Sequence, residues 1–390
     1  MKLLVILSRV PYPLDKGDKL RAFNQIKQLS KNNEIVLFAL DDKNTDEKIL
    51  IELEKYCVSI TVIKLSITTI ILNLIRTFFN GNPLQVGYFY SKKAQKKLDE
   101  LILQQKPDHI YCQLIRASEY VKKYRNISKT LDYMDVFSKG MERRKSTESF
   151  FLKPIFAMEY RRLIKYEHDA FQYFNNKTII SEQDKNLIRH PENSDIIIIP
   201  NGVDTDYFKP INHKKEFELL FNGNMNYPPN IESVEFLANK IMPLVWKKLP
   251  HVRLLISGSS PNNKVLALQS NKIVVSGWMD DIRENFYKSK ILVAPMQISI
   301  GLQNKLLEAM AMQLPCVTST LANNALKAKH NEQILVADTP EQYAKYIIEL
   351  LENEEKAKQI ALNGYHFVLE NFNWESTTNT LEKLFHAIHK

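Results

Sequence analysis

The residues with the clearest chemical potential lie in Ala294–Ser319, APMQISIGLQNKLLEAMAMQLPCVTS. We predict that a strand ends early in this segment and that a loop containing Gly301 leads into a helix carrying Lys305 and Glu308. Free backbone N–H groups and the dipole at the start of such a helix attract phosphate. Lys305 can then contact a diphosphate, and Glu308, one turn later, can accept hydrogen bonds from a ribose diol. The alternative is an ordinary solvated ion pair on a helix surface.

A second polar cluster lies at Leu131–Arg144, LDYMDVFSKGMERR. Asp132 and Asp135 follow a predicted strand, and open α/β sheets bind ligands at the carboxyl ends of their strands. Either carboxylate can orient or deprotonate an acceptor hydroxyl, although an aspartate here is also typical of a helix N-cap. Three arginines near this cluster can grip an acceptor diphosphate or lie on the surface as ordinary charges: Arg116, Arg143 and Arg144.

The patterns that would indicate a metal site are weak. Asp204 and Asp206 form an Asp-x-Asp sequence, which binds metal in some enzymes, but they follow Asn201–Gly202 in a predicted turn. The nine histidines are scattered, and the three cysteines make no metal-ligand spacing. We therefore predict no metal and no cofactor, and reduced thiols typical of a cytoplasmic protein.

Short apolar segments alternate with amphipathic helices along the chain, as in proteins with buried parallel strands. In the first half, the predicted strands are Lys2–Leu7, Glu34–Leu40, His109–Cys112, Lys177–Ser181 and Ile196–Pro200. In the second half, they are Phe217–Asn222, Val252–Ser257, Ile273–Ser276, Ile291–Ala294 and Cys316–Ser319. Two such series predict an α/β fold of two Rossmann-like, doubly wound domains that face each other across a cleft. We expect domains at 1–199 and 200–365, with a C-terminal helix, 366–390, packing back on the first domain.

The net charge of +9 and pI of about 9.1 suggest an anionic partner. Nucleic acid is the least favoured partner, because no zinc-finger, helix-turn-helix or aromatic RNA-binding pattern is present. Two segments suggest peripheral contact with the anionic inner face of the plasma membrane: the nearly uncharged Leu65–Phe79, too short to span a bilayer, and the basic, aromatic Phe150–Phe174. Both are also compatible with ordinary helices packed on a sheet. The first residues, MKLLVILSRVPYP, resemble a strand more than a signal peptide.

Several motifs together resemble the family-4 retaining glycosyltransferases, which have the two-domain GT-B fold. The resemblance covers the whole chain, and the closest subgroup is the polysaccharide-locus sugar transferases with a GIQNK-x-LEAMA-like loop. Besides the loop before Glu308, the motifs are SEQDKNLI (Ser181–Ile188), IPNGVDTDYF (Ile199–Phe208), FNGNMNYPPN (Phe221–Asn230) and LLISGSSP (Leu254–Pro261).

The resemblance implies roles for individual residues. In the donor domain, Gly301, Leu302 and Gln303 would offer backbone N–H groups to the diphosphate, and Glu308 would hold the ribose. Further donor contacts would come from Gly223, Asn224 and Met279, the last of these beside the base. In the first domain, the loop PYPLDKGDKLR would bring Gly17 to the donor phosphates, and Arg21 and Arg116 are the candidate acceptor-binding residues.

The sequence also departs from the family pattern at three places. Ile300 stands where the family commonly has a glutamate that holds the donor sugar. Asn224 and Asn230 stand where a cationic pair commonly clamps the diphosphate, so Lys305 is our candidate to supply that charge. Gln113 stands where the family often has a catalytic histidine, and it joins Asp132 and Asp135 as a candidate catalytic residue.

These observations predict a glycosyltransferase that moves a sugar from a UDP- or GDP-linked donor to a lipid-linked or oligosaccharide acceptor in polysaccharide synthesis. The resemblance further implies retention of configuration. One alternative is a catalytically weak GT-B scaffold protein in a glycan assembly complex, which the substitutions at Ile300, Asn224 and Asn230 favour. Another is a nucleotide-sugar epimerase on the same fold. A Rossmann dehydrogenase is disfavoured because no G-x-G-x-x-G follows a predicted strand.

Overall fold

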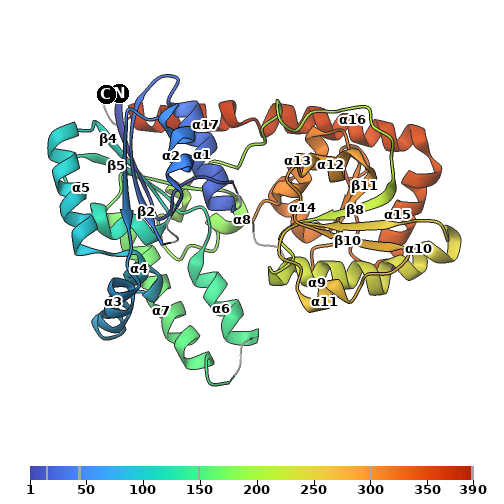
Figure 1. Ribbon diagram of the computed structural model, residues 1–390, viewed down its shortest axis with the longest axis horizontal. Helices are drawn as coiled ribbons and strands as arrows, with labels where there is room; N and C mark the ends of the chain where they lie inside the picture. The colour runs from blue at the N-terminus through green and yellow to red at the C-terminus, as the bar shows by residue number, and fades with distance from the viewer. Residues whose placement is uncertain (15, 43–44, 148–149, 299–300, 388–390) are drawn as a thin grey trace. The chain divides into compact units, whose positions relative to one another are not determined.

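The computed structural model describes residues 1–14, 16–42, 45–147, 150–298 and 301–387. The chain forms two compact units, Met1–Pro200 together with Trp374–Lys390, and Asn201–Asn373. Each unit is built on one parallel sheet with helices on its faces, as Figure 1 shows.

The first unit contains a seven-stranded sheet in the order β3-β2-β1-β4-β5-β6-β7, and every described strand pair is parallel. Its strands are β1 (Lys2–Leu7), β2 (Glu34–Asp41), β3 (Ser59–Lys64), β4 (His109–Gln113), β5 (Ser128–Asp132), β6 (Asn176–Ile179) and β7 (Ile197–Ile198). Its α-helices are α1 (Gly17–Leu29), α2 (Glu47–Glu54), α3 (Ile67–Asn80), α4 (Leu84–Phe89), α5 (Lys92–Gln105), α6 (Phe137–Thr147), α7 (Lys153–Asp169), α8 (Glu182–Lys185) and α17 (Trp374–Ala387). Three short 3₁₀ helices complete it: η1 (Ile115–Val121), η2 (Ala170–Gln172) and η3 (Asn193–Asp195).

The second unit contains a six-stranded sheet in the order β10-β9-β8-β11-β12-β13, also parallel. Its strands are β8 (Phe217–Asn222), β9 (Leu254–Ser257), β10 (Ile273–Gly277), β11 (Ser289–Ala294), β12 (Cys316–Thr318) and β13 (Leu335–Val336). Its helices are α9 (Pro228–Phe236), the π-helix η4 (Leu237–Ile241), α10 (Met242–Lys248), α11 (Asn263–Leu266), α12 (Arg283–Tyr287), α13 (Asn304–Ala311), α14 (Thr320–Leu326), α15 (Pro340–Glu352) and α16 (Glu354–Asn371).

The strand predictions agree with the structure because buried parallel strands are continuous apolar runs. Lys2–Leu7 and Phe217–Asn222 are strands with the predicted bounds, and the other predicted strands differ by a few residues at their ends. No bounds were predicted for β3, β5 or β13: β3 is mostly half-buried, β5 (SKTLD) contains a single apolar residue, and β13 has two residues. A strand this short or this exposed has no clear apolar signature.

Helix α17 belongs to the first unit, although the chain before it belongs to the second. The return to the first unit is at Trp374, later than the expected position 366, because α16 continues to Asn371. On the first unit, the Phe385 ring lies 4.6 Å from the His109 ring and 5.6 Å from the Tyr111 ring. Leu381 and Phe385 join the core formed by β1, β2 and α1.

The helices of the described residues do not include one that is both long and apolar enough to cross a bilayer. Leu65–Phe79 forms the 14-residue helix α3 instead.

The packing of α17 gives a stability prediction. Phe385→Ala removes a fully buried ring, so we expect it to lower the free energy of unfolding of the first unit by about 3–5 kcal/mol. Urea unfolding followed by circular dichroism measures the change. Lys383→Ala, an exposed residue on the same helix, is the matched control. Equal stability of the two variants would show that α17 does not contribute to this core.

Candidate functional site

A glycine lies at the carboxyl end of three neighbouring strands in the second unit, and another lies in the loop that follows the next strand. Gly223 follows β8, Gly258 follows β9, and Gly277 ends β10. Gly301 lies in the loop between β11 and α13 and has a φ of 64°, a left-handed conformation that favours glycine. Ligands of open α/β sheets bind at this edge, so the glycines open the backbone where a ligand can approach.

Gly258 shows how closely the backbone packs at this edge. Its φ is 136°, and a Cβ placed on it would lie 1.7 Å from the carbonyl oxygen of Gly223. Gly223 is also crowded, because a Cβ there would lie 2.7 Å from Asn230 Nδ2 and 3.2 Å from Lys305 Nζ. Side chains at either position would displace the groups that surround Lys305.

Lys305 is buried in this crowded region, with 8% of its surface exposed. Its ammonium donates to Asn230 Oδ1 at 2.7 Å, contacts the sulfur of Met296 at 3.8 Å, and lies 4.3 Å from the centre of the Phe221 ring. We call Gly223, Asn230, Lys305, Met296 and Phe221 the Lys305 cluster. The hydrogen-bond partners of the ammonium within the described residues are therefore neutral.

The electrostatics of Lys305 and Glu308 follow from burial. Burial lowers the pKa of Lys305 to about 7, opposed by the negative charge of Glu308. Burial raises the pKa of Glu308 to about 7, opposed by the positive charge of Lys305. A buried amine that can be charged near neutral pH gains strongly from a nearby anion. The alternative of a solvated surface pair is incorrect for Lys305, which is buried against neutral groups.

The loop before α13 supplies backbone donors at the same edge. Gly301 and Leu302 are buried, and Gln303 stands at the N-cap position of α13. The N-cap residue Gln303 makes no side-chain capping hydrogen bond to α13, and its carbonyl accepts from the N–H of Leu306 at 3.0 Å. Ile300, the site of the missing family glutamate, lies outside the described residues.

Two other predicted donor residues lie at this edge but outside the Lys305 cluster. Asn224 is exposed, its side chain accepts a hydrogen bond from the backbone N–H of Asn226, and its carbonyl accepts from Asn230 Nδ2. Met279 is half-buried just beyond β10. The structure thus brings Gly223, Asn230 and Lys305 together, while Asn224 only positions Asn230.

In the first unit, Arg21 and Asp132 form a fully buried ion pair. Arg21 Nε donates to Asp132 Oδ2 at 2.6 Å, and both side chains are 0% exposed. Tyr111 and Thr178 also donate to the same carboxylate, at 2.8 and 3.1 Å. The prediction that Arg21 binds the acceptor and that Asp132 acts in catalysis therefore needs correction: neither group is accessible to a substrate, and their contacts join α1, β4, β5 and β6.

Asp135, the other candidate carboxylate, is only half-buried. It accepts from the backbone N–H of Val136 at 2.7 Å. Burial raises the pKa of Asp135, and the charges of Arg143 and Arg116 oppose that rise. A raised pKa suits a carboxylate that accepts a proton.

The remaining predicted residues of the first unit lie around the loop after β1. Gln113 is the last residue of β4, is buried, and has an Nε2 with no hydrogen-bond partner among the described residues. It lines a small crevice with Ser8, Arg9 and Asp18. Gly17 is the exposed first residue of α1.

Arg116 lies on η1 and lines a separate pocket, which also includes Arg9. Arg9 therefore lines this pocket as well as the crevice beside Gln113, although it was not among the residues predicted from the sequence. The available signal was its position directly after the first buried strand, where parallel sheets bind ligands.

The chain is similar to known proteins in both sequence and structure. Residues 216–353, which include the Lys305 cluster and Glu308, match the family described as glycosyl transferases group 1. Over 412 aligned positions, the chain is 26% identical to an uncharacterized 44.6 kDa protein in the cps region of Klebsiella pneumoniae, covering 98% of this chain and 99% of that protein.

Two solved structures share the fold of the whole chain. Sucrose-phosphate synthase of Thermosynechococcus elongatus aligns with a TM-score of 0.73 and 15% identity, covering 100% of this chain and 99% of that one. Anabaena Alr3699/HepE, in complex with UDP-glucose, aligns with a TM-score of 0.70 and 12% identity, covering 99% of each chain. At these identities the likeness shows the two-unit fold alone.

The two aspartates of the first unit predict different mutant behaviour. Asp132→Asn leaves the buried charge of Arg21 without a counter-charge, so we expect the unfolding free energy to fall by about 3–5 kcal/mol. Asp135→Asn keeps an acceptor for Val136 and should change stability by less than about 1 kcal/mol. Urea unfolding of both variants measures this contrast. A stable Asp132→Asn protein would contradict the structural role of the pair.

Proposed function

We propose that this chain, which is a glycosyltransferase of the GT-B fold, takes its sugar from a nucleotide diphosphate donor bound at the Lys305 cluster. The observation that carries the proposal is the buried ammonium of Lys305, whose hydrogen-bond partners in the described chain are neutral. Burying a cation is costly unless an anion compensates it, and a diphosphate would supply that anion.

The surrounding groups suit the rest of such a donor. Backbone N–H groups of Gly301–Gln303 and the dipole of α13 would bind the diphosphate oxygens. Glu308, one turn further along α13, would accept hydrogen bonds from the ribose hydroxyls. Met279, at the end of β10, would contact the base. The structure of HepE, which shares this fold, contains UDP-glucose, and this supports a nucleotide sugar as the donor.

Lys305 would also replace the cationic pair that the family resemblance implies. Asn224 and Asn230 stand at the corresponding positions, and Asn230 Oδ1 lies 2.7 Å from the Lys305 ammonium. The positive charge would thus reach the same place from α13 instead of from the β8–α9 segment. This arrangement favours an active transferase over a catalytically weak scaffold protein.

In the proposed reaction, the bond between the anomeric carbon and the diphosphate oxygen breaks while an acceptor oxygen bonds to that carbon. The electron pair of the broken bond goes to the diphosphate, where Lys305 and the N–H groups of α13 stabilise the charge. Asp135 would take the acceptor proton, and Gln113 would orient the acceptor. The family resemblance implies retention of configuration.

We propose a lipid-linked or oligosaccharide acceptor and a role in polysaccharide synthesis. The similarity to a protein in the cps region of Klebsiella pneumoniae supports this setting. The first unit offers Asp135, Gln113 and Arg116 for the acceptor.

Replacing Lys305 tests the donor site. Thermal shift with a panel of UDP- and GDP-sugars should identify a stabilising nucleotide, and Lys305→Met should weaken its binding at least about tenfold, or about 1.4 kcal/mol, in isothermal titration. Lys345→Met, an exposed lysine on α15 of the same unit, should bind like the parent protein. Unchanged affinity in Lys305→Met would refute the assignment, and no stabilisation by any nucleotide would favour a scaffold protein.

The pKa of Lys305 predicts how binding depends on pH. In the free protein this pKa is about 7, and a bound diphosphate favours the charged amine and so raises it. Between the two pKa values binding takes up a proton, so the affinity should fall as pH rises above about 7, by at most about tenfold per pH unit. A nucleotide sugar is the better probe, because its diphosphate is esterified at both ends and does not titrate in this range.

Titrations between pH 6 and 9, in two buffers with different ionisation enthalpies, measure this proton uptake directly. Lys305→Met should lose most of the pH dependence. Glu308, whose pKa is also about 7, would favour binding as it ionises and so oppose this fall; an affinity that is constant over this range in both the parent and Glu308→Gln would contradict the proposed contact between Lys305 and the diphosphate.

A further inference from the structure

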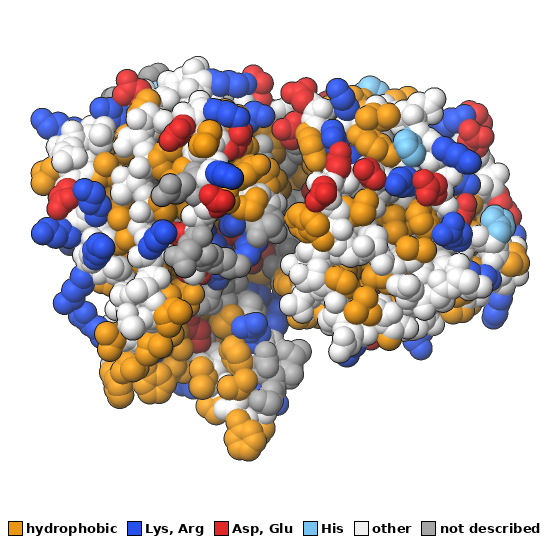
Figure 2. All heavy atoms as spheres, in the orientation of Figure 1, with side chains coloured by type: hydrophobic (Ala, Val, Ile, Leu, Met, Phe, Trp, Pro, Cys, Tyr) orange, Lys and Arg blue, Asp and Glu red, His pale blue; other side chains and the backbone are white. Residues whose placement is uncertain are grey.

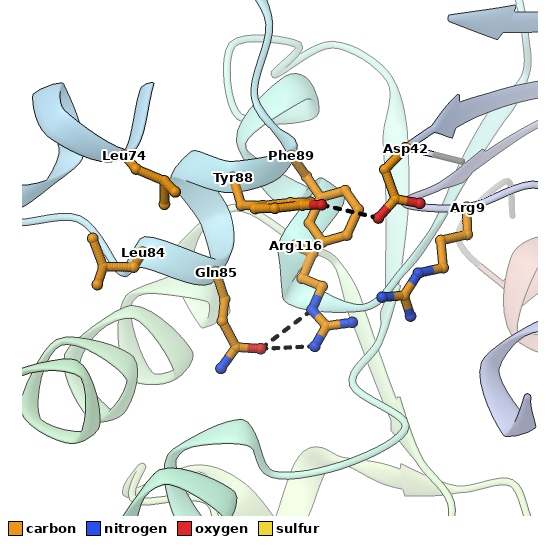
Figure 3. A pocket seen from close by; sticks show the side chains of 8 residues that line it. All are labelled: Arg9, Asp42, Leu74, Leu84, Gln85, Tyr88, Phe89 and Arg116. Carbon is orange, nitrogen blue, oxygen red and sulfur yellow. Dashed lines mark hydrogen bonds between the residues drawn. The ribbon is translucent and has the colours of Figure 1, made fainter. Parts of the chain in front are cut away.

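A pocket in the first unit combines two guanidinium groups with an apolar wall. It measures about 290 Å³ and is lined by Arg9, Asp42, Leu74, Leu84, Gln85, Tyr88, Phe89 and Arg116. Figure 3 shows Leu74 and Leu84 on one side and the arginines on the other. The two kinds of wall match a ligand with an anionic group at one end and a hydrocarbon chain at the other.

The hydrogen-bond acceptor of Arg116 in this pocket is a neutral amide, and the rings of Phe89 and Phe137 lie close to its guanidinium. Arg116 Nη2 donates to Gln85 Oε1 at 2.7 Å, and its guanidinium lies 4.4 Å from the Phe137 ring centre. Both guanidinium groups lie over the Phe89 ring, at 5.6 Å for Arg9 and 5.5 Å for Arg116. Two cations on one ring repel each other, so an anion between them would be bound favourably.

Three carboxylates lie near these two arginines, namely Asp18, Asp42 and Asp135. Arg9 Nη1 pairs with Asp18 Oδ2 at 2.9 Å, while Arg9 Nε is buried and has no hydrogen-bond partner in the described chain. Asp42 accepts from the Tyr88 hydroxyl at 3.2 Å. Arg116 Nε and Nη2 both donate to a neutral amide, Gln85. Donors therefore remain for a phosphate, which arginine binds well.

The apolar wall of the pocket continues into an exposed helix. Leu74 belongs to α3, whose other apolar side chains mostly face outward, with Phe79 82% exposed. Figure 2 shows hydrophobic side chains gathered over α3, at its lower left. The exposed members of this face are Ile67, Ile71, Leu72, Ile75, Phe78 and Phe79.

Specific contacts hold α3 in this exposed position. Arg162 of α7 donates to the carbonyl oxygens of Thr77, Phe78 and Asn82 at 2.7–3.1 Å. The buried Glu159, also on α7, accepts from the first two N–H groups of α4, at 2.7 and 3.0 Å. Gly87 of α4 allows close packing, because a Cβ there would lie 2.0 Å from Thr77 Oγ1. These contacts with α7 and α4 therefore hold α3 with its apolar face toward solvent.

A second exposed apolar group lies at the start of α7, at the same end of the first unit as α3 (Figure 1). It consists of Phe150, Phe151, Leu152 and Ile155, with Phe151 87% exposed. Between Phe150 and Lys165 the sequence contains one carboxylate, the buried Glu159, and helix α3 contains none. The exposed charges of these two segments are all positive: Arg76, Lys153, Arg161 and Lys165.

We infer that the first unit docks on an anionic bilayer through α3 and the start of α7, and that the Arg9–Arg116 pocket then binds the phosphate of a lipid-linked acceptor. An apolar face whose own exposed charges, among the described residues of these two segments, are all cationic matches the interface of such a bilayer. A helix of 14 residues, about 21 Å long, would lie in the plane of the interface. This inference rests on the proposed transferase function, since it names the acceptor of that reaction.

Vesicle sedimentation tests the docking surface. The full-length protein should bind phosphatidylcholine vesicles containing phosphatidylglycerol, more strongly at low salt than at high salt. The triple variant Ile71→Ser, Leu72→Ser and Phe79→Ser should partition at least tenfold less. Leu103→Ser removes an equally exposed apolar side chain from α5 and should partition like the parent. No vesicle binding by the parent, or equal binding by the triple variant, would overturn the inference, as would self-association that depends on α3 without vesicle binding.

Polyprenyl monophosphate in neutral phosphatidylcholine vesicles tests the pocket. It should increase binding of the parent but not of Arg116→Gln, and inorganic phosphate at the same concentration should not compete. An equal increase in both proteins would overturn the pocket assignment, and full competition by inorganic phosphate would mean that the site takes free phosphate. Nucleotide binding, measured by thermal shift in parallel, reports the donor site, so its failure would count against the proposed function and not against docking.

Discussion

The proposed donor site depends on the amine of Lys305, which is buried among neutral hydrogen-bond partners and has Glu308 as its nearby opposite charge. Lys305 lies beneath the carboxyl edge of the second sheet, against an amide, a thioether and an aromatic ring. The crowding around Gly223 and Gly258 keeps this position compact, because a side chain at either glycine would meet the groups that hold the lysine. A charge in such a place is stabilised by a nearby anion, which is the physical basis for proposing that the cluster binds an anionic donor.

The carboxyl edges of the two sheets carry different kinds of residue. In the second unit, glycines after successive strands open the backbone toward a ligand. In the first unit, the edge carries side chains: Arg9 after β1, Gln113 at the end of β4, and Asp135 beyond β5. The buried pair of Arg21 and Asp132 lies beneath this edge and joins α1 to the central strands. It holds the polar groups in position without taking part in the chemistry.

Helix α3 exposes apolar side chains to solvent, and specific hydrogen bonds hold it in that position. Its outward face would be unfavourable in water, yet Arg162 and Glu159 fix both the end of α3 and the start of α4. The pocket beside it shares Leu74 with that helix and places two arginines at its other end. A charged pocket continuous with an apolar face is a chemically consistent site for an amphipathic lipid phosphate.

The sequence by itself determined the fold class and most of the parallel strands. Apolar runs, helix periodicity and local motifs are all encoded over a few residues, and the GT-B glycosyltransferase prediction rested on them. The tertiary structure alone decided which charged residues are accessible. Asp132 and Asp135 are three positions apart, yet one is locked against Arg21 and the other is half-exposed. Arg9 and Arg116 are far apart in sequence, yet both guanidinium groups lie over the Phe89 ring. Burial and long-range pairing depend on how segments that are distant in sequence pack together. A local sequence pattern does not encode that packing.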